Sequence, residues 1–340
     1  MREIWSGIDV AKASFEASWV EPGSRVEELA QIAHRSFQRC PEGVQAYLRW
    51  LDRQAGERPL RVRVVMEATG RYSLELIAWL LGERPSLEPA LVNPKQAHHF
   101  QKSLGLRNKT DAVDARSLGL MGQQRRPAAY QALEPAYQAL RDLIRQRRAL
   151  VEILVSENNR LSEAPDSKAV RAVLESHVRS LKKLIERLEK ALRKTVESSD
   201  SLNRDVELLI TLPGVGWIVA VTVLGELGDL RRYRRSRQVA AAAGLAPCNH
   251  QSGETNRPAR IDRNGSGEVR AVLYLAALTA CRSNHHRLAR VYHHLIDDNH
   301  LCKREALVAL MRKTLVIGRA LLIHNRPYDD NFAEQTSVAS

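Results

Sequence analysis

Two runs of apolar residues with heptad spacing occupy the middle of this sequence and decide how it folds there. The first run ends before the segment APDS and the second begins after it, so two long helices joined by a proline-containing turn are predicted. Such helices pack either as an antiparallel coiled-coil hairpin, a common spacer or dimer contact, or as two members of a compact bundle. The heptad positions are Leu133, Tyr137, Leu140, Ile144, Val151, Leu154, Leu161, Leu174, Val178, Leu181, Ile185, Leu188 and Leu192, with Arg147 and Asn158 at polar seam positions.

The residues before the heptads show alternating strand and helix patterns. EIWSGIDVA and ASFEASWVE predict a β-hairpin, RVRVVMEAT a buried strand, SLELIAWLLGE an amphipathic helix and LEPALVN a further strand. A helix follows in NKTDAVDARSLGL, where Thr110 is a suitable N-cap. Strands that alternate with helices predict an α/β domain in which a sheet is flanked by helices.

The last third predicts a mainly helical domain interrupted by loops. In LLITLPGVGWIVAVTVLGEL the segment LPGVG separates two apolar helices, which is the pattern of a helix-hairpin-helix. Its glycines would let backbone amides approach a phosphate, although the same residues also suit a plain turn between helices. LRRYRRSRQ follows directly, and its arginines suit either a sugar-phosphate backbone or a solvated helix start.

Charge and composition restrict the class of protein. The chain has a formal net charge of +13, which favours a polyanionic partner such as nucleic acid, although a solvated basic surface gives the same number. With 44% hydrophobic residues it has the composition of a folded protein, and no apolar run approaches the length of a membrane span. The four cysteines form no C-x-x-C pair and the start lacks a signal-peptide pattern, so a cytoplasmic protein without a membrane partner is predicted.

Four acidic residues stand where a divalent cation could bind. Asp9 and Glu67 each end a predicted strand, and an acid there is costly to bury unless it is paired or bound to metal. Asp111 and Asp114 lie on one face of a helix start, where they either complement the helix dipole or ligate a metal. Carboxylates are the ligands that Mg²⁺ prefers, and two such ions about 4 Å apart can hold the attacking and leaving oxygens of a phosphodiester. Four acids together in a basic chain favour the metal site.

Several motifs resemble one protein family. GIDVAK, MEATGRY, NPKQAHHFQKSLGLRNKTDAVDA and AAAAGLAPCNHQSG resemble, in the same order, segments of the DEDD-type insertion-sequence transposases, the RuvC-like recombinases related to the Piv invertases. The resemblance covers nearly the whole chain, and GLRNKTDAVDA is very specific. It implies an α/β RNase H/RuvC-like domain (residues 1–130), a coiled-coil hairpin (131–200) and a mainly α C-terminal transposase domain with the helix-hairpin-helix (201–340).

The resemblance also implies a chemistry and partners. Asp9, Glu67, Asp111 and Asp114 match the family's catalytic acids, which hold one or two Mg²⁺ ions, and Ser252 in QSG matches its nucleophile. A serine that attacks phosphorus forms a covalent phosphoserine-DNA intermediate and so preserves the energy of the broken bond. The implied partners are donor and target DNA, a noncoding bridge RNA, and further copies of the chain in a dimer or tetramer. The residues expected to contact nucleic acid are Arg107, Lys109, Arg231, Arg232, Arg234, Arg235, Arg257, Arg260 and Arg263.

Two neighbouring features admit a second interpretation each. The stretch CNHQSGETNRPARIDRNGSGEVRAVLY, which contains Ser252, is predicted to be a loop rich in Gly, Asn and Arg that leads into a helix. Ser266 in NGSGE is a second serine of this loop, and the residues alone do not exclude it as the nucleophile. Cys281 and the histidines of SNHHRLARVYHHL have spacing that could hold zinc. No compact four-ligand set is present, however, and histidines on an arginine-rich helix more often face solvent or DNA.

Three functions remain in competition. The leading interpretation is a DNA recombinase or transposase of an insertion sequence, with a site-specific DNA invertase of the same family as its nearest alternative. A RuvC-like structure-specific nuclease would use the acids and water, and Ser252 would then be dispensable. A nucleic-acid-binding module with structural acids would show no Mg²⁺ dependence, and a shared fold does not separate these functions.

Overall fold

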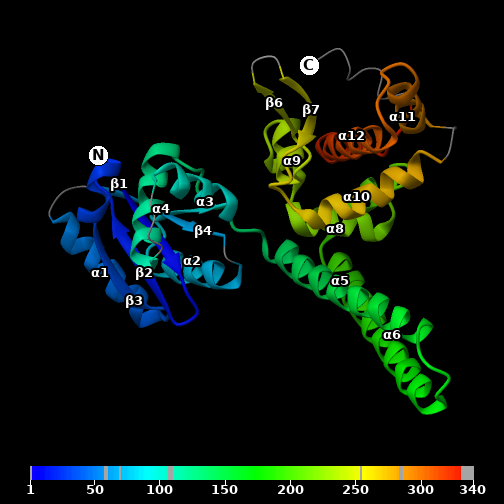
Figure 1. Ribbon diagram of the computed structural model, residues 1–340, viewed down its shortest axis with the longest axis horizontal. Helices are drawn as coiled ribbons and strands as arrows, with labels where there is room; N and C mark the ends of the chain where they lie inside the picture. The colour runs from blue at the N-terminus through cyan, green and yellow to red at the C-terminus, as the bar shows by residue number, and fades with distance from the viewer. Residues whose placement is uncertain are drawn as a thin grey trace. The chain divides into compact units, whose positions relative to one another are not determined.

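The chain forms two compact units, Met1–Ala132 and Leu133–Ser340. The computed structural model describes residues 2–56, 60–68, 70–105, 110–252, 255–282 and 286–330. The division into domains at residues 130 and 200 stays a prediction. The elements of the first unit (Figure 1) are β1 (Arg2–Val10), β2 (Ser14–Trp19), η1 (Val26–Gln31), β3 (Ala33–Gln38), α1 (Pro41–Ala55), β4 (Leu60–Glu67), α2 (Arg71–Glu83), β5 (Glu88–Val92), α3 (Pro94–Ser103) and α4 (Asp111–Arg125).

The first unit is built on a five-stranded mixed sheet with the order β3-β2-β1-β4-β5. β1, β2 and β3 pair antiparallel, whereas β4 and β5 run parallel to β1. This confirms the predicted hairpin, the two later strands and the flanking helices. The edge strand β3 and the helices α1 and α3 were not predicted. For β3 the reason is that the strand is mostly exposed and shows no clear alternation.

Alternating side chains divide the sheet residues between two apolar cores. Ile4, Ile8 and Met66 join one core together with residues of α1 and α2. Trp5 and Val65 join the other core together with residues of α3 and α4. Successive residues of a strand point to opposite faces, so helices cover both faces of the sheet in three layers.

Helix α4 lies unusually close to β1, which brings its first turn near the end of that strand. A Cβ atom on Gly7 would lie 2.1 Å from the carbonyl oxygen of Ala115 and 2.2 Å from the amide nitrogen of Gly119. The buried Ser18 hydroxyl joins the two elements, because it accepts from the Gly7 amide at 3.1 Å and donates to the Ala115 carbonyl at 2.9 Å. Small residues therefore set the distance between the strand that carries Asp9 and the helix that carries Asp111.

Replacing Gly7 with alanine should push α4 away from the sheet. The added methyl group has no room against the helix backbone, so we expect the free energy of unfolding to fall by about 3 kcal/mol in urea titrations followed by tryptophan fluorescence. Gly82→Ala is the matched control, because no atom lies within 4 Å of a Cβ at that helical position. The control should leave stability unchanged or raise it slightly. Equal midpoints for Gly7→Ala and the wild type would contradict the close packing.

In the second unit, the two heptad segments form α5 (Pro135–Ser162) and α6 (Lys168–Glu197), which lie side by side (Figure 1). Arg147 pairs with Glu189, and Glu157 farther along α5 pairs with His177 nearer the start of α6, so the helices run antiparallel. The predicted two-helix hairpin is confirmed, while supercoiling stays a prediction. Asn158, predicted at a seam position, is exposed; Glu157 is the buried polar residue instead.

The base of this hairpin shares a core with the helices that follow. Tyr137, Leu140, Ile144, Leu192 and Val196 all belong to the main core of the second unit. Among the described residues, no helix is both long and apolar enough to span a membrane. The remaining elements are α7 (Asp200–Ile210), α8 (Trp217–Leu227), η2 (Leu230–Arg232), α9 (Ser236–Ala242), β6 (Pro247–Ser252), β7 (Thr255–Ile261), α10 (Gly267–Ala280), α11 (Arg287–Asp297) and α12 (Lys303–His324).

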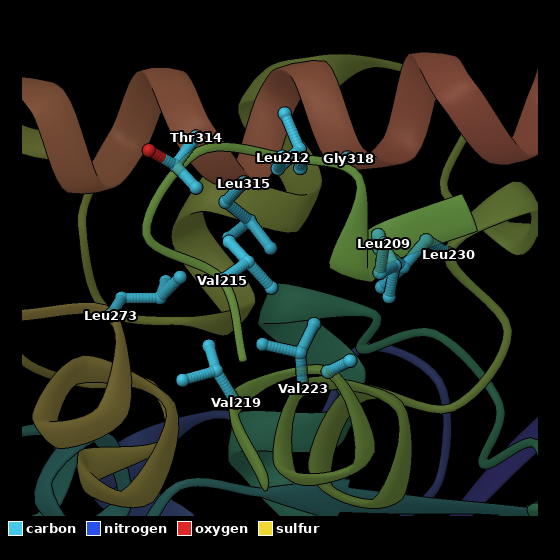
Figure 2. Close-up of a pocket in the computed structure, with 11 residues that line it drawn as sticks. Leu209, Leu212, Val215, Val219, Val223, Leu230, Leu273, Thr314, Leu315 and Gly318 are labelled. Carbon is cyan, nitrogen blue, oxygen red and sulfur yellow. The ribbon is translucent and has the colours of Figure 1, made fainter. Parts of the chain in front are cut away.

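A small apolar pocket lies within this core, where α7, α8, α10 and α12 meet (Figure 2). Apart from Thr314, its lining residues are leucine, valine, alanine and glycine. The Thr314 hydroxyl donates to the Leu310 carbonyl of its own helix at 3.0 Å. With no polar group left to orient a ligand, we interpret the pocket as part of the core.

Candidate active site

The first two acids meet at one edge of the sheet. β1 and β4 pair in parallel with Ile8 opposite Met66, so the next residues, Asp9 and Glu67, are neighbours at the ends of their strands. Ile8 and Met66 point into the core beneath α1 and α2. Because side chains alternate along a strand, Asp9 and Glu67 point to the opposite face, which α4 covers.

The other two acids occupy the first turn of α4. The Thr110 hydroxyl caps this helix by accepting from the Val113 amide at 3.3 Å, as predicted. Asp111 and Asp114 follow directly, and the close packing of α4 on β1 brings this turn toward the Asp9 end of the strand. The sheet edge and the helix start therefore bring all four acids into one region of the first unit.

The electrostatics of Asp9 show how closely the acids interact. Burial, followed by the negative charges of Asp114, Asp111 and Glu67, raises the pKa of the Asp9 carboxyl from 3.8 to about 6. Mutual repulsion of this kind is relieved by a cation, and an all-carboxylate donor set suits a hard ion such as Mg²⁺. Within the described ranges, no three His, Cys, Asp or Glu side chains are gathered closely enough to hold an ion. The residue types fit a metal, and the carboxylates would have to turn inward to bind it.

Gln101 is a site residue that the sequence analysis did not single out. Its side-chain amide on α3 donates to Asp114 Oδ1 at 2.9 Å and to the Ser117 hydroxyl at 3.0 Å. The Ser117 hydroxyl in turn donates to the Asp114 carbonyl at 2.9 Å. These bonds fix the orientation of the Asp114 carboxylate. No local pattern marks Gln101, because its role depends on contacts with α4 and the burial of Ala97 one turn before it follows from the fold.

Ser252 lies in a β-ribbon rather than in the predicted loop. β6 and β7 pair antiparallel, and Ser252 is the last residue of β6, opposite Thr255. The register shifts between Cys248 and His250, which is the mark of a bulge in the ribbon. The loop prediction was wrong because Pro, Gly and Asn disfavour strands locally, while cross-strand pairing depends on partners along the ribbon. The Ser252 side chain lies outside the described part of the chain.

The rival serine has a structural role. Ser266 is the N-cap of α10, where its hydroxyl oxygen accepts from the Val269 amide at 3.3 Å. The same hydroxyl is 3.4 Å from Glu226 Oε2, and Glu226, almost fully buried, receives two hydrogen bonds from Arg145 at 2.7 and 3.0 Å. These contacts hold Ser266 at the start of α10, where its hydroxyl serves as the helix cap.

The predicted nucleic-acid contacts fall into two groups. Arg231 is engaged within the fold: it binds Asp205 through two hydrogen bonds of 2.6 and 2.7 Å and donates to the Leu322 carbonyl at 3.0 Å. Arg232 stacks on Tyr233 at 5.1 Å, and Arg319 supports this segment by donating to the Tyr233 and Arg234 carbonyls. The other described members of the predicted set, which are also exposed, are Arg232, Arg234, Arg235, Arg260 and Arg263, whereas Arg107, Lys109 and the Arg257 side chain lie outside the described residues.

Packing and helix capping account for two further features for which ligand binding was one of the interpretations. Gly214 of LPGVG has a φ of 81°, and a Cβ there would lie 2.2 Å from the Ala276 carbonyl oxygen, so packing against α10 already requires glycine. Among the histidines, His286 caps α11 by accepting from the Ala289 amide, and His294 binds Asp298 at 2.6 Å. His285 lies outside the described residues. These contacts support neither phosphate binding by a helix-hairpin-helix nor a zinc site.

Comparison with known proteins assigns the class. A DEDD transposase model of the IS110 type matches residues 6–167, which include all four acids, and a model described as "Transposase IS116/IS110/IS902 family" matches residues 206–293, which include Ser252. The chain is therefore a transposase-class recombinase, an enzyme that catalyses DNA strand transfer. It belongs to the IS110 family of DEDD transposases.

Individual relatives carry two kinds of name. The pilin gene-inverting protein of Moraxella bovis is 27% identical over 98% of this chain and 100% of its own length. The transposase for insertion sequence element IS1328 of Yersinia enterocolitica is 27% identical over 55% of this chain and 62% of its own length. The transposase for IS1111A of Coxiella burnetii is 34% identical over a shorter stretch, 24% of this chain and 22% of its own length.

Proposed function

We propose that this protein is a Mg²⁺-dependent DNA recombinase of an insertion sequence that cuts and rejoins strands through a covalent phosphoserine. The observation that carries the proposal is the gathering of four carboxylates where two strand ends meet the start of α4. Burial and then the charges of the other three acids raise the pKa of Asp9 to about 6. Asp9, Glu67, Asp111 and Asp114 would hold one or two ions. Bound Mg²⁺ would neutralise charge on the scissile phosphate and orient it.

The chain's own residues supply the remaining chemistry. The Ser252 oxygen attacks phosphorus and gives up its proton while the bond from phosphorus to the 3′ oxygen breaks. The departing 3′ oxygen takes up a proton, so a 5′-phosphoserine and a free 3′-hydroxyl form. Attack by a 3′-hydroxyl on this ester reverses the step and releases the serine, which rejoins DNA without ATP. The exposed Arg260 and Arg263 lie toward the end of the β6–β7 ribbon that is away from Ser252, where they suit a neighbouring phosphate of the bound DNA.

The partners in this proposal are donor and target DNA, a bridge RNA and further copies of the chain. The formal charge of +13 and the exposed segment from Arg232 to Arg235 support binding of nucleic acid. Exposed apolar side chains on the outer turns of the hairpin support a homo-oligomer, dimer or tetramer, in which these turns meet. They are Ile153, Val155, Val170, Val173 and Leu184.

DNA inversion is the second candidate, because the match to the pilin gene-inverting protein runs from end to end of that relative. Inversion and transposition share the cutting and joining chemistry and differ in the arrangement of the two sites. A structure-specific nuclease would use the same acids without Ser252.

Reconstitution with purified full-length protein tests the proposal. We expect joined products from plasmids carrying the element's own junction and target, only with Mg²⁺ and the RNA that copurifies with the protein. EDTA or ribonuclease should each abolish joining, and light scattering on the same sample should show a multimer. Joining that persists after ribonuclease treatment would refute the RNA guide, and cutting without joining would favour the nuclease. Inverted plasmids in place of insertions would identify an invertase.

A further inference from the structure

Arg39 connects the two segments that follow the strand-end acids. It lies between β3 and α1, and its backbone amide donates to the Ala13 carbonyl at 2.9 Å. Its side-chain Nε donates to the Lys12 carbonyl at 2.9 Å, and Nη1 donates to Glu75 Oε2 at 2.7 Å. One arginine thus holds the turn between β1 and β2 and, at the same time, helix α2.

The surroundings of Arg39 fix its guanidinium plane. The guanidinium carbon lies 4.4 Å from the centre of the Tyr72 ring and 5.8 Å from that of Trp79, both on α2. Only 11% of the Arg39 side chain is exposed. Cation–π contacts and ion pairs are stronger when they are shielded from water. This connection is therefore rigid compared with an ion pair at the surface.

The two connected segments are the continuations of the acid-bearing strands. Lys12 follows Asp9 by one tight turn, and α2 begins shortly after Glu67. Asp9 still pairs with Glu16 of β2, and Glu67 with Val92 of β5. The parallel pairing that joins β1 to β4 ends at Ile8 and Met66, one residue before the acids, so this ladder does not itself fix the turn relative to α2. Arg39 acts just beyond that last pair.

We propose that Arg39 is a positioning residue that sets the spacing of the Asp9 and Glu67 carboxylates for cation binding. This inference rests on the proposed metal centre. Arg39 touches neither acid in these contacts; it acts through Lys12 and Glu75. Residues that orient metal ligands from outside typically change metal affinity about 10- to 100-fold when they are replaced.

Arg71 provides a matched comparison on the same acceptor. It also pairs with Glu75, but 85% of its side chain is exposed, and it lies one turn before Glu75 on the surface of α2. A solvent-exposed ion pair within one helix contributes little to the stability of the fold. Replacing Arg71 therefore removes a charge and an ion pair from Glu75 without releasing the turn at Lys12.

The test measures Mn²⁺ binding to the free full-length protein by electron paramagnetic resonance, counting only the sites that Asp9→Asn removes. Lysine keeps the charge of Arg39 but lacks the planar fork that reaches two acceptors while stacking on rings. We expect Arg39→Lys to weaken Mn²⁺ binding about 10-fold, and Arg39→Met at least as much. Arg71→Gln should bind Mn²⁺ like the wild type. Thermal unfolding of each variant, followed by circular dichroism, shows whether the fold is retained.

The possible outcomes distinguish the positioning role of Arg39 from the proposed metal centre on which it rests. Wild-type Mn²⁺ affinity in a folded Arg39→Lys protein would overturn the positioning role and leave the metal centre standing. Equal weakening by Arg39→Lys and Arg71→Gln would also overturn it, because loss of either bond to Glu75 would then be enough and the hold on the turn at Lys12 would play no part. A wild-type protein without saturable Mn²⁺ binding would overturn the metal centre, and the role of Arg39 with it. Should Arg39→Met fail to fold, Arg39→Lys and Glu75→Gln decide the question.

Discussion

Strand cleavage should be lost in Glu67→Gln while DNA binding is retained. Glutamine keeps the shape of the side chain but removes the negative charge that a divalent cation requires, so we expect cleavage to fall at least about 100-fold. The basic surface that provides affinity for DNA is unchanged, and the dissociation constant and its salt dependence should stay near those of the wild type. Gel-shift titrations and cleavage of a labelled duplex in Mg²⁺ measure the two quantities on one preparation.

Glu83→Gln is the control for this experiment, because it makes the same change of charge on an exposed residue of α2. It should cleave and bind DNA like the wild type. Asp111→Asn should behave like Glu67→Gln if both acids serve one centre. Recombination at the wild-type rate by either variant in Mg²⁺ would refute the assignment of the acids as metal ligands.

Ser252→Ala should abolish joining and the covalent adduct together. The acids and metal alone explain a nuclease; a protein nucleophile is what makes cutting reversible. A suicide substrate, in which the departing strand is lost after cutting, should trap wild-type protein on DNA. Mass spectrometry of the digested adduct should then locate a 5′-phosphoryl linkage on Ser252.

Ser266→Ala distinguishes the two serines. Loss of its N-cap bond to Val269 should lower stability by about 1 kcal/mol, while the adduct still forms. An adduct on Ser266, or full recombination by Ser252→Ala, would mean that Ser252 is the wrong residue. Efficient cutting without any adduct would favour the nuclease that uses water.

The strand-end acids could be predicted from the sequence because their signal is local. Asp9 and Glu67 follow apolar strand residues, and parallel pairing of those strands places them side by side. Asp111 and Asp114 share a helix turn after a clear N-cap. In each case a few consecutive residues determine where the side chain lies, and one sheet then brings the segments together.

The supporting contacts could not be predicted, because each joins residues far apart in the chain. In the sequence, Arg231 belongs to an arginine cluster. In the structure, both of its terminal nitrogens donate to Asp205, which lies on a different helix. Arg39 likewise resembles any surface cation in the sequence, whereas in the structure it donates to the Lys12 carbonyl and to Glu75. The packing of α4 on Gly7 depends equally on tertiary structure, since no local pattern marks that glycine as a contact.

The long hairpin has a consequence for how members of such a family can diverge. α5 has 28 residues and is about 42 Å long at 1.5 Å per residue, yet only its first turns, from Tyr137 to Ile144, enter the core of the second unit. The outer turns of α5 contact chiefly α6. If seven residues are added to both helices, or removed from both, the apolar stripe of each helix still faces the other helix. The length of the hairpin can therefore evolve separately from both folded cores, and in the proposed oligomer such a change would adjust the spacing between copies without altering the acidic site.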